Sequence, residues 1–476
     1  MARKLAALTA LALASVTCAS AYYHFLQYKG RTAPFTPIPE KFDISALPAG
    51  KLLYFVSETG PATMASGDSI ESIVGQIRMA AAVWNTVGTS ELKLQFGGFA
   101  HDDSTQNAPG LDIVFEEMPD GVVAMGGPTT LASVTDAEDG SFIPITRSVV
   151  ILQSDLSSQA SYSDSFFLTV VHELGHALGL QHTMTSSAMS TSLTRATTRS
   201  RPLAGDDIAG LSLLYPTTGF ASATGTITGR VTMSDTGVHL ASVVALTPNG
   251  NAVSTLTDPD GSYELAGLTP GQYYLFVHPL PPAQQDGLGP ADVVLPTDLD
   301  GKSFDAGGAF QTEFYPGTKD ILAAAVLKVT AGKTLSGYDF SVASRGSLDL
   351  YAVTTYSFPG NYSVKPAFLT MDDTGNFLVA SGVGLITDSA PSAGLDAAVI
   401  GGAAWIPEDG VKAYATAPSY LQLNFTFNPF SGQGSRHLMF TKSNDLYILP
   451  NGLNLVYQKP PTIKSVTPSV DGSGNR

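Results

Sequence analysis

The sequence predicts a multidomain protein in which an α+β domain, with a mixed sheet plus three helices, is followed by two all-β sandwich domains. Three observations lead to this prediction. The chain has 476 residues, enough for about two to four domains. Residues 51–216 alternate strand-like apolar runs with three helical patterns. From residue 226 onward only short strand-like runs remain, separated by Gly, Pro and Asp turns, which is typical of β-sandwiches.

The composition restricts the kinds of partner. Charged residues make up 14% of the chain, hydrophobic residues 43%, and the formal net charge is −16 at pH 7. A chain this apolar can bury sizeable cores and is not disordered overall. Its negative charge is spread without acidic blocks and would be repelled by nucleic acid and by anionic membranes. We therefore expect a soluble acidic protein that binds no nucleic acid.

The first 21 residues have the pattern of a secretory signal peptide. Arg3 and Lys4 give a positive start, residues 5–16 form an apolar run, and residues 19–21 are a small-residue cleavage pattern. The run is shorter than the about 20 residues that span a membrane, and nothing amphipathic follows it to favour a buried core helix. Cys18, the only cysteine, lies inside this segment, so no disulfide is expected. We expect a secreted protein without a membrane span.

The expected elements of the α+β domain follow from apolar spacing. A first helix ends near Trp84 and begins after Asp68, which we interpret as forming a capping box with Glu71. A second helix begins near Ser163, and a third runs from Asp206 to about residue 214. Strands are expected at 52–56, 92–96, 112–115, 122–125 and 148–152.

The other boundaries follow from changes in composition. Residues 22–50 are rich in proline and are interpreted as a leader or short propeptide. The remaining segments are residues 51–216 as the α+β domain, 217–225 as a linker, 226–345 as the first β-sandwich, 346–457 as a β-rich immunoglobulin-like domain, and 458–476 as a flexible tail or an incomplete module.

A short histidine-rich segment carries the chemistry. On a helix, His172 and His176 lie about one turn apart, so both imidazoles can reach one cation. Glu173 points beside them, placed to contact the attacking water rather than the metal. Gly179 can adopt a left-handed conformation and end the helix, so that His182 can supply a third nitrogen. Three protein ligands leave one corner of tetrahedral zinc open, which is typical of a catalytic site.

The alternative is that these residues are core histidines or charged groups on a solvated helix face. Two histidines and a glutamate aligned on an apolar helix would be costly to bury unpaired. From ordinary residue usage, the full pattern is expected by chance in about one chain in a hundred thousand of this length. We therefore prefer the metal site.

The segment 172–182 matches the extended zinc signature of the metzincin metalloproteases, and the chain resembles the matrixins among them. Met189 stands seven residues past His182, where this group has a Met-containing turn beneath the zinc. Thr183 follows the third histidine, where matrixins usually have Ser. Residues 203–215 look like the closing helix of a matrixin catalytic domain. The likeness covers about residues 50–216.

This resemblance implies a metzincin-like fold and a zinc metalloendopeptidase that acts on a protein or peptide. One catalytic Zn²⁺ would be held by His172, His176 and His182, with Glu173 as the general base. Met189 and Gly179 would support the site without binding the metal.

The resemblance also suggests where a substrate would lie. An extended substrate would lie along an edge strand at residues 121–126. The segment 190–203 would wall the pocket for the residue after the cut. Its arginines, Arg195, Arg199 and Arg201, could attract acidic substrate residues, but we interpret them as solvated loop charges. The sequence assigns no individual substrate-binding residue.

Two features depart from vertebrate matrixins. They usually stay latent through a propeptide cysteine bound to zinc, and that switch is absent because Cys18 is the only cysteine. They usually also hold a structural zinc through additional histidines. Before His172 the secreted chain offers only His24 and His101, so this second site is expected to be missing. The run His101-Asp102-Asp103 is interpreted as a solvated loop rather than a metal site.

Residues 226–345 resemble the carboxypeptidase regulatory-like β-sandwich. Asp258 and Asp260 could bind Ca²⁺, but a hairpin turn closed by Gly261 is the preferred interpretation, which leaves a calcium ion unsupported. The β domains could bind a surface or a polymer. A different class of protein therefore stays open, namely a secreted adhesive protein with a degenerate protease domain, although all four site residues are intact.

Overall fold

The computed structural model describes most of the chain from residue 23 onward. The described residues are 23–100, 109–131, 133–137, 140–191, 194–248, 250–281, 293–358, 363–370, 377–385, 392–395, 414–417, 420–424, 433–442 and 445–458. The expected signal peptide, the run His101-Asp102-Asp103 and the tail beyond residue 458 lie outside them. No helix within the described residues has the length and apolarity needed to cross a membrane.

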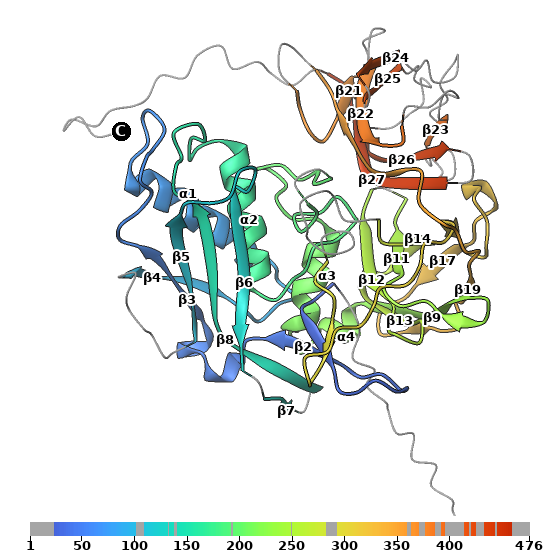
Figure 1. The fold of residues 1–476 in the computed structure, drawn as a ribbon, viewed down its shortest axis with the longest axis horizontal. Helices are drawn as coiled ribbons and strands as arrows, with labels where there is room; N and C mark the ends of the chain where they lie inside the picture. Colours follow the sequence, from blue (N-terminus) through green and yellow to red (C-terminus); the bar gives the residue numbers. More distant parts are fainter. Residues whose placement is uncertain are drawn as a thin grey trace, which may run out of the picture.

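A mixed nine-stranded sheet organises the first domain (Figure 1). Parallel pairs join β2 to β8, β8 to β5, β5 to β3 and β3 to β4, while β6 and β7 pair antiparallel with β8. The strands of this domain are β1 (Leu26–Tyr28), β2 (Pro37–Lys41), β3 (Leu52–Ser57), β4 (Leu94–Ala100), β5 (Gly110–Glu116), β6 (Ala124–Thr130), β7 (Thr135–Ala137) and β8 (Gly140–Gln153). This agrees with the expected mixed sheet, and each of the five predicted strands overlaps an observed one.

Three longer helices accompany the sheet: α1 (Ile70–Asn85), α2 (Asp164–Ala177) and α3 (Gly205–Leu214). Apolar side chains of all three share one core with strands β3, β5 and β8. Ser163 caps α2 as predicted, because its hydroxyl accepts a hydrogen bond from the Phe166 N–H at 3.1 Å. The three predicted helices are therefore present at their predicted places.

The capping box of α1 differs from the prediction. Ser69 is the N-cap, and it exchanges hydrogen bonds with Ser72 rather than with Glu71. Asp68 lies outside the box and accepts a hydrogen bond from the Ser161 N–H at 2.7 Å. Asp68 therefore ties the start of α1 to the loop before α2, a contact between segments far apart in the sequence.

The segment predicted as a leader or propeptide is built into the sheet. Strand β1 pairs antiparallel with β2, and it also pairs in parallel with β15 (Thr297–Asp298) of the second domain. Tyr28 is fully buried and donates a hydrogen bond to Asp258 at 2.9 Å, and Arg31 forms an ion pair with Asp298 at 2.9 Å. Residues 23–41 thus join the first two domains, and removal of this segment during maturation stays a prediction.

The second domain consists of two facing sheets. One contains β9 (Gly225–Met233), β10 (Thr236–Gly237), β13 (Ser262–Leu268), β18 (Thr334–Leu335) and β19 (Phe340–Ser341). The other contains β11 (Ser242–Leu246), β12 (Ala252–Leu256), β14 (Gly271–His278), β16 (Glu313–Phe314) and β17 (Val326–Val329). Ile227 of the first sheet and Val243 and Leu275 of the second belong to one buried core between them. Within the expected linker, Phe220 is buried and begins a short helix, α4 (Phe220–Ala223).

The third domain is also β-rich and packs on the second. Its described strands form two sheets: β20 (Tyr351–Tyr356), β22 (Phe377–Val383), β24 (Tyr414–Ala417) and β25 (Tyr420–Asn424) in one, and β21 (Phe368–Thr370), β23 (Ser392–Leu395), β26 (Gly434–Lys442) and β27 (Asp445–Val456) in the other. Leu446 and Ile448 of β27 share a buried cluster with Val244 and Phe276 of the second domain. The sheet containing β11 is therefore covered on both faces, which explains why all five residues of β11 are buried.

Candidate metal centre

Helix α2 and the loop after it carry the predicted ligands. The helix ends at Ala177, and Gly179 follows two residues later with a φ of +103°, a left-handed conformation that favours glycine. A side chain there would also collide, because a Cβ atom on Gly179 would lie 2.7 Å from the carbonyl oxygen of Glu40. The Leu180 N–H donates back to the Gly175 carbonyl at 3.1 Å, which turns the chain toward His182. Gly179 thus lies at the turn between the helix and His182, and its supporting role stays a prediction.

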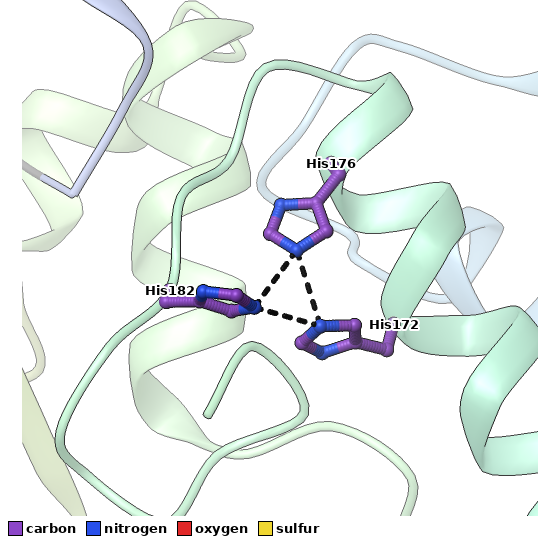
Figure 2. A group of neighbouring side chains, drawn as sticks. All are labelled: His172, His176 and His182. Carbon is purple, nitrogen blue, oxygen red and sulfur yellow. Dashed lines mark hydrogen bonds between the residues drawn. The ribbon is translucent and has the colours of Figure 1, made fainter. Parts of the chain in front are cut away.

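The three histidines converge on one point (Figure 2). The Nε2 atoms of His172 and His176 are 3.1 Å apart, those of His172 and His182 are 3.1 Å apart, and those of His176 and His182 are 3.2 Å apart. Zn–N bonds of about 2.0–2.1 Å at tetrahedral angles place the nitrogens about 3.3 Å apart. The triangle is therefore close to the size that one zinc ion requires, with a fourth direction left for a small molecule.

The hydrogen bonds of the opposite ring nitrogens define the tautomers. Nδ1 of His172 lies 2.6 Å from the Ala188 carbonyl oxygen, and Nδ1 of His176 lies 2.8 Å from the Leu180 carbonyl oxygen. A carbonyl only accepts, so each Nδ1 must carry the proton and each Nε2 must present a lone pair. Lone pairs that face one another at this distance repel unless a cation lies between them, so the donor set fits a metal ion.

Burial also favours the neutral form of the imidazole rings. His172 and His176 are 4% and 8% exposed, and His182 is half-buried. Burial lowers the pKa of His172 well below its usual value and lowers the pKa of His176 to about 3. Both rings are therefore uncharged near neutral pH, which is the form that binds a metal. Within the described residues, no other group of three metal-binding side chains lies as close together.

Glu173 lies beside the three histidines and is 7% exposed. Burial raises the pKa of its carboxyl to about 7, while the charge of Arg195 acts in the opposite direction. A Cβ atom added to Gly126 of β6 would come within 3.1 Å of Glu173 Oε2. The Glu173 side chain therefore lies against strand β6.

Met189 packs against Gly175 of α2, between the first two histidines, and is 1% exposed. A Cβ atom added to Gly175 would lie 2.2 Å from Met189 Sδ and 2.9 Å from the Trp84 ring. Trp84 in turn donates its indole N–H to the Val171 carbonyl at 3.0 Å. The glycine between the first two histidines is thus required for the close approach of the methionine.

We expect Gly175→Ala to lower the free energy of unfolding by about 1–3 kcal/mol, because the added methyl group must displace Met189 or Trp84 from a packed core. The matched control is Gly75→Ala in α1, where a Cβ atom would have no neighbour within 4 Å. That control should be neutral or stabilising by up to about 1 kcal/mol, since alanine favours a helix. Urea unfolding of both variants measures the difference, and equal stabilities would contradict the proposed packing.

Asp207 is a residue that the sequence analysis did not single out. It binds the turn of residues 187–190 that contains Met189, which we call the methionine turn. Its carboxylate accepts hydrogen bonds from the backbone N–H groups of Ala188 at 2.9 Å and Met189 at 3.0 Å, and from that of Ala204 at 2.7 Å. Burial raises the pKa of Asp207 to about 6 against the effect of these donors. Because the Ala188 carbonyl accepts from His172, Asp207 supports a ligand through the turn. The sequence showed that Asp207 lies in the first turn of α3, but it did not show that its carboxylate binds the methionine turn.

Two of the three loop arginines are not solvated charges, so that interpretation was wrong for them. Arg199 is half-buried, forms an ion pair with Asp164 at 3.0 Å and lies over the Phe167 ring at 4.2 Å. The guanidinium of Arg195 is also half-buried and donates to carbonyl oxygens of Ser190 and Leu168 at 3.2 and 3.3 Å. Both side chains anchor the loop to α2.

Arg201 is exposed, as expected for a loop charge, and its guanidinium contacts the Ser435 hydroxyl at 3.5 Å.

In the second domain, Gly261 has a φ of +84° and its N–H donates to the Asp258 carbonyl at 2.8 Å, which is the predicted turn. The Asp258 carboxylate accepts from Tyr28, and that of Asp260 accepts from the Ser262 backbone at 3.0 Å.

The expected substrate strand is shifted along the chain. Strand β6 spans Ala124–Thr130 rather than residues 121–126, and in the described part of the structure it pairs only with β8. Its outer edge is therefore available for a further strand. Val123, just before this strand, and Met125 within it are 50% and 54% exposed, which leaves apolar side chains on the surface.

The first domain thus combines a mixed sheet with three histidines that could hold a metal ion. Residues 71–216 match the family model of the matrixins (Peptidase_M10), and residues 226–293 match that of the carboxypeptidase regulatory-like domain. The chain therefore contains a matrixin domain followed by a carboxypeptidase regulatory-like domain, which confirms both resemblances. The matrixin family is zinc-dependent, and its peptidase domain implies a protein substrate.

The comparisons with whole proteins add little. No curated protein matches the chain. Among solved structures, it is similar to a DUF3823 family protein from Parabacteroides merdae, with 10% identity over 49% of this chain and 100% of that chain and a TM-score of 0.16. It is also similar to the TIE protein of Bacillus anthracis, with 10% identity over 50% of this chain and 51% of that chain and a TM-score of 0.16. TM-scores this low support no argument about fold or function.

Proposed function

We propose that this chain is a secreted zinc-dependent endopeptidase. The single observation that carries the proposal is the convergence of three Nε2 lone pairs, 3.1–3.2 Å apart, beside a buried glutamate. The matrixin match over residues 71–216 supports the same class of enzyme. The pattern of residues 1–21 supports secretion, and N-terminal sequencing of the exported protein should begin at Tyr22.

The roles of the residues follow from their places. His172, His176 and His182 would hold the zinc ion, which when bound supplies a Lewis acid for the attacking water and the scissile carbonyl. Glu173 accepts the proton of that water on its carboxylate and later passes it to the leaving amine. Its burial suits this task, because burial raises the pKa of the carboxyl and so makes the carboxylate a better base. Met189 packs under the ligands and takes no part in proton transfer.

The substrate would lie extended along the outer edge of β6. Main-chain hydrogen bonds to this edge would align the peptide, and the exposed side chains of Val123 and Met125 would contact alternate residues of it. Glu173 lies against Gly126 of the same strand, so a peptide bound there would have a bond close to the carboxylate. Because Gly126 has no side chain, a bound peptide could come close to the Glu173 carboxylate.

Metal analysis combined with zymography tests the proposal against an adhesive protein that has lost its activity. We expect the purified full-length chain to hold about one zinc ion and to clear casein or gelatin gels. A chelator should abolish the clearing, and added zinc should restore it. A chain that holds zinc but cleaves neither these proteins nor a peptide library would favour the adhesive alternative.

A further inference from the structure

The second domain makes direct contact with the loop that carries the third histidine. Gln181 immediately precedes His182 and is 5% exposed. Its amide nitrogen donates to the Val294 carbonyl at 3.0 Å, and its amide oxygen accepts from the Val294 N–H at 3.0 Å. This pair of hydrogen bonds holds the side chain in one orientation, because both ends of the amide are bound to main chain of the second domain.

A second contact reaches the segment between His182 and Met189. Asp206 is 1% exposed, and its carboxylate accepts hydrogen bonds from both the backbone N–H and the hydroxyl of Ser254 at 2.8 Å. The same carboxylate accepts from the Thr185 hydroxyl at 2.5 Å. Ser254 lies on β12 of the second domain and is fully buried. Asp206 therefore connects that strand to the loop three residues after His182.

The N-terminal segment adds a third contact on the other side of the loop. The Gln181 N–H donates to the Tyr23 carbonyl at 2.8 Å, and the Phe25 N–H donates to the Gly179 carbonyl at 3.0 Å. The Tyr23 hydroxyl donates to the Ser242 hydroxyl of the second domain at 2.7 Å. The loop between Gly179 and His182 is thus enclosed by the second domain and by a segment that is itself bound to that domain.

We propose that the second domain positions the zinc ligand His182, through Gln181 and Ser254 as positioning residues, and is therefore part of the catalytic unit. His182 lies in a loop, so no helix or strand ladder orders it, unlike His172 and His176. Its orientation must therefore come from tertiary contacts. One of these stays within the first domain, because the Thr183 N–H donates to the Met189 carbonyl at 3.1 Å. Others end at Val294 and Ser254 of the second domain. The inference rests on the proposed zinc site and assigns the carboxypeptidase regulatory-like domain a role in its assembly.

The test compares Gln181→Ala and Ser254→Ala with matched controls in the full-length protein. The controls are Gln159→Ala, a half-buried glutamine that contacts Ser165, and Ser262→Ala, a serine that begins β13 of the second domain and contacts Asp260. Zinc affinity is measured by competition with a chromogenic chelator, which needs no substrate. We expect about 10–100-fold weaker zinc binding in the two test variants and little change in the controls, as is typical when outer contacts of ligands are lost.

Kinetics with saturating zinc separates positioning from general destabilisation. A disturbed His182 should lower kcat while KM for a cleaved peptide stays near its wild-type value. Unchanged zinc affinity and kcat in both folded test variants would overturn the proposal. If Gln181→Ala fails to fold, the zinc affinity and kcat of Ser254→Ala alone decide the test, because this variant keeps the backbone hydrogen bond to Asp206. A wild-type chain that binds zinc without cleaving peptides would refute the proposed function but leave the affinity comparison valid.

Discussion

Replacing Glu173 with Ala is expected to reduce peptide cleavage by about 10²–10⁴-fold, the range that general acid–base catalysis contributes. The neighbouring carboxylates of α3 are engaged elsewhere: that of Asp207 accepts from the backbone of Ala188 and Met189, and that of Asp206 accepts from Thr185 and Ser254. We therefore expect neither of them to take over the proton transfer. Zinc content should stay at the wild-type level, because Glu173 is not among the three converging ligands.

Two further variants make the Glu173 result specific. Glu173→Gln has the same shape but accepts no proton, so its kcat should fall as far as that of Glu173→Ala, whereas a packing defect alone would spare it. Glu91→Ala, at an exposed site, should retain wild-type activity. The rate of cleavage of a fluorogenic peptide and the zinc content of each protein are the measurements. Undiminished cleavage by Glu173→Gln would refute the assignment of the general base.

Replacing His176 with Ala should remove both zinc and activity. Nε2 of His176 lies within 3.2 Å of both other ring nitrogens, so its loss leaves two protein ligands where a stable site needs at least three. We expect zinc content to fall from about one ion per chain to a small fraction of that. The unfolding temperature should also lose its dependence on added zinc, since a ligand stabilises only a state that binds it.

The control for this variant is His278→Ala. His278 is also poorly accessible, but it lies on β14 of the second domain, stacks on Phe276 and contacts the Pro279 carbonyl. Its loss removes these contacts within the second domain, yet it should leave one zinc ion bound. Metal analysis of the two purified variants gives the answer. A His176→Ala protein that retains its zinc and its cleavage rate would show that the three-histidine centre is not the active metal site.

Part of the architecture could be predicted because its signals are local. The three helices were found from apolar spacing and from Ser163, and the strands of the second domain from short apolar runs between turns. The capping box of α1 was misplaced by one residue, because Asp68 and Ser69 are both good caps and the choice depends on Ser161. The interpretation of Arg195 and Arg199 as solvated loop charges was wrong for the same reason: it depended on partners elsewhere in the chain, which lie on α2.

The sequence by itself determined which side chains could form the proposed metal site and act as its general base. His172, Glu173 and His176 share one helix, whose regular geometry places their side chains together whatever surrounds them. Gly179 then predicts the turn that brings His182 back. These relations depend on backbone conformation within eleven residues, so spacing alone reveals them.

Only the tertiary structure decided what holds these residues in place. Asp207 accepts from Met189, 18 residues before it, and Gln181 is bound by Val294, 113 residues after it. Such hydrogen bonds leave no periodicity or spacing in the chain, because any buried donor and acceptor can form them once the domains have packed. The pairing of residues 23–41 with two domains is equally invisible in the sequence, since strand pairing is chosen by the sheet edges that folding brings together.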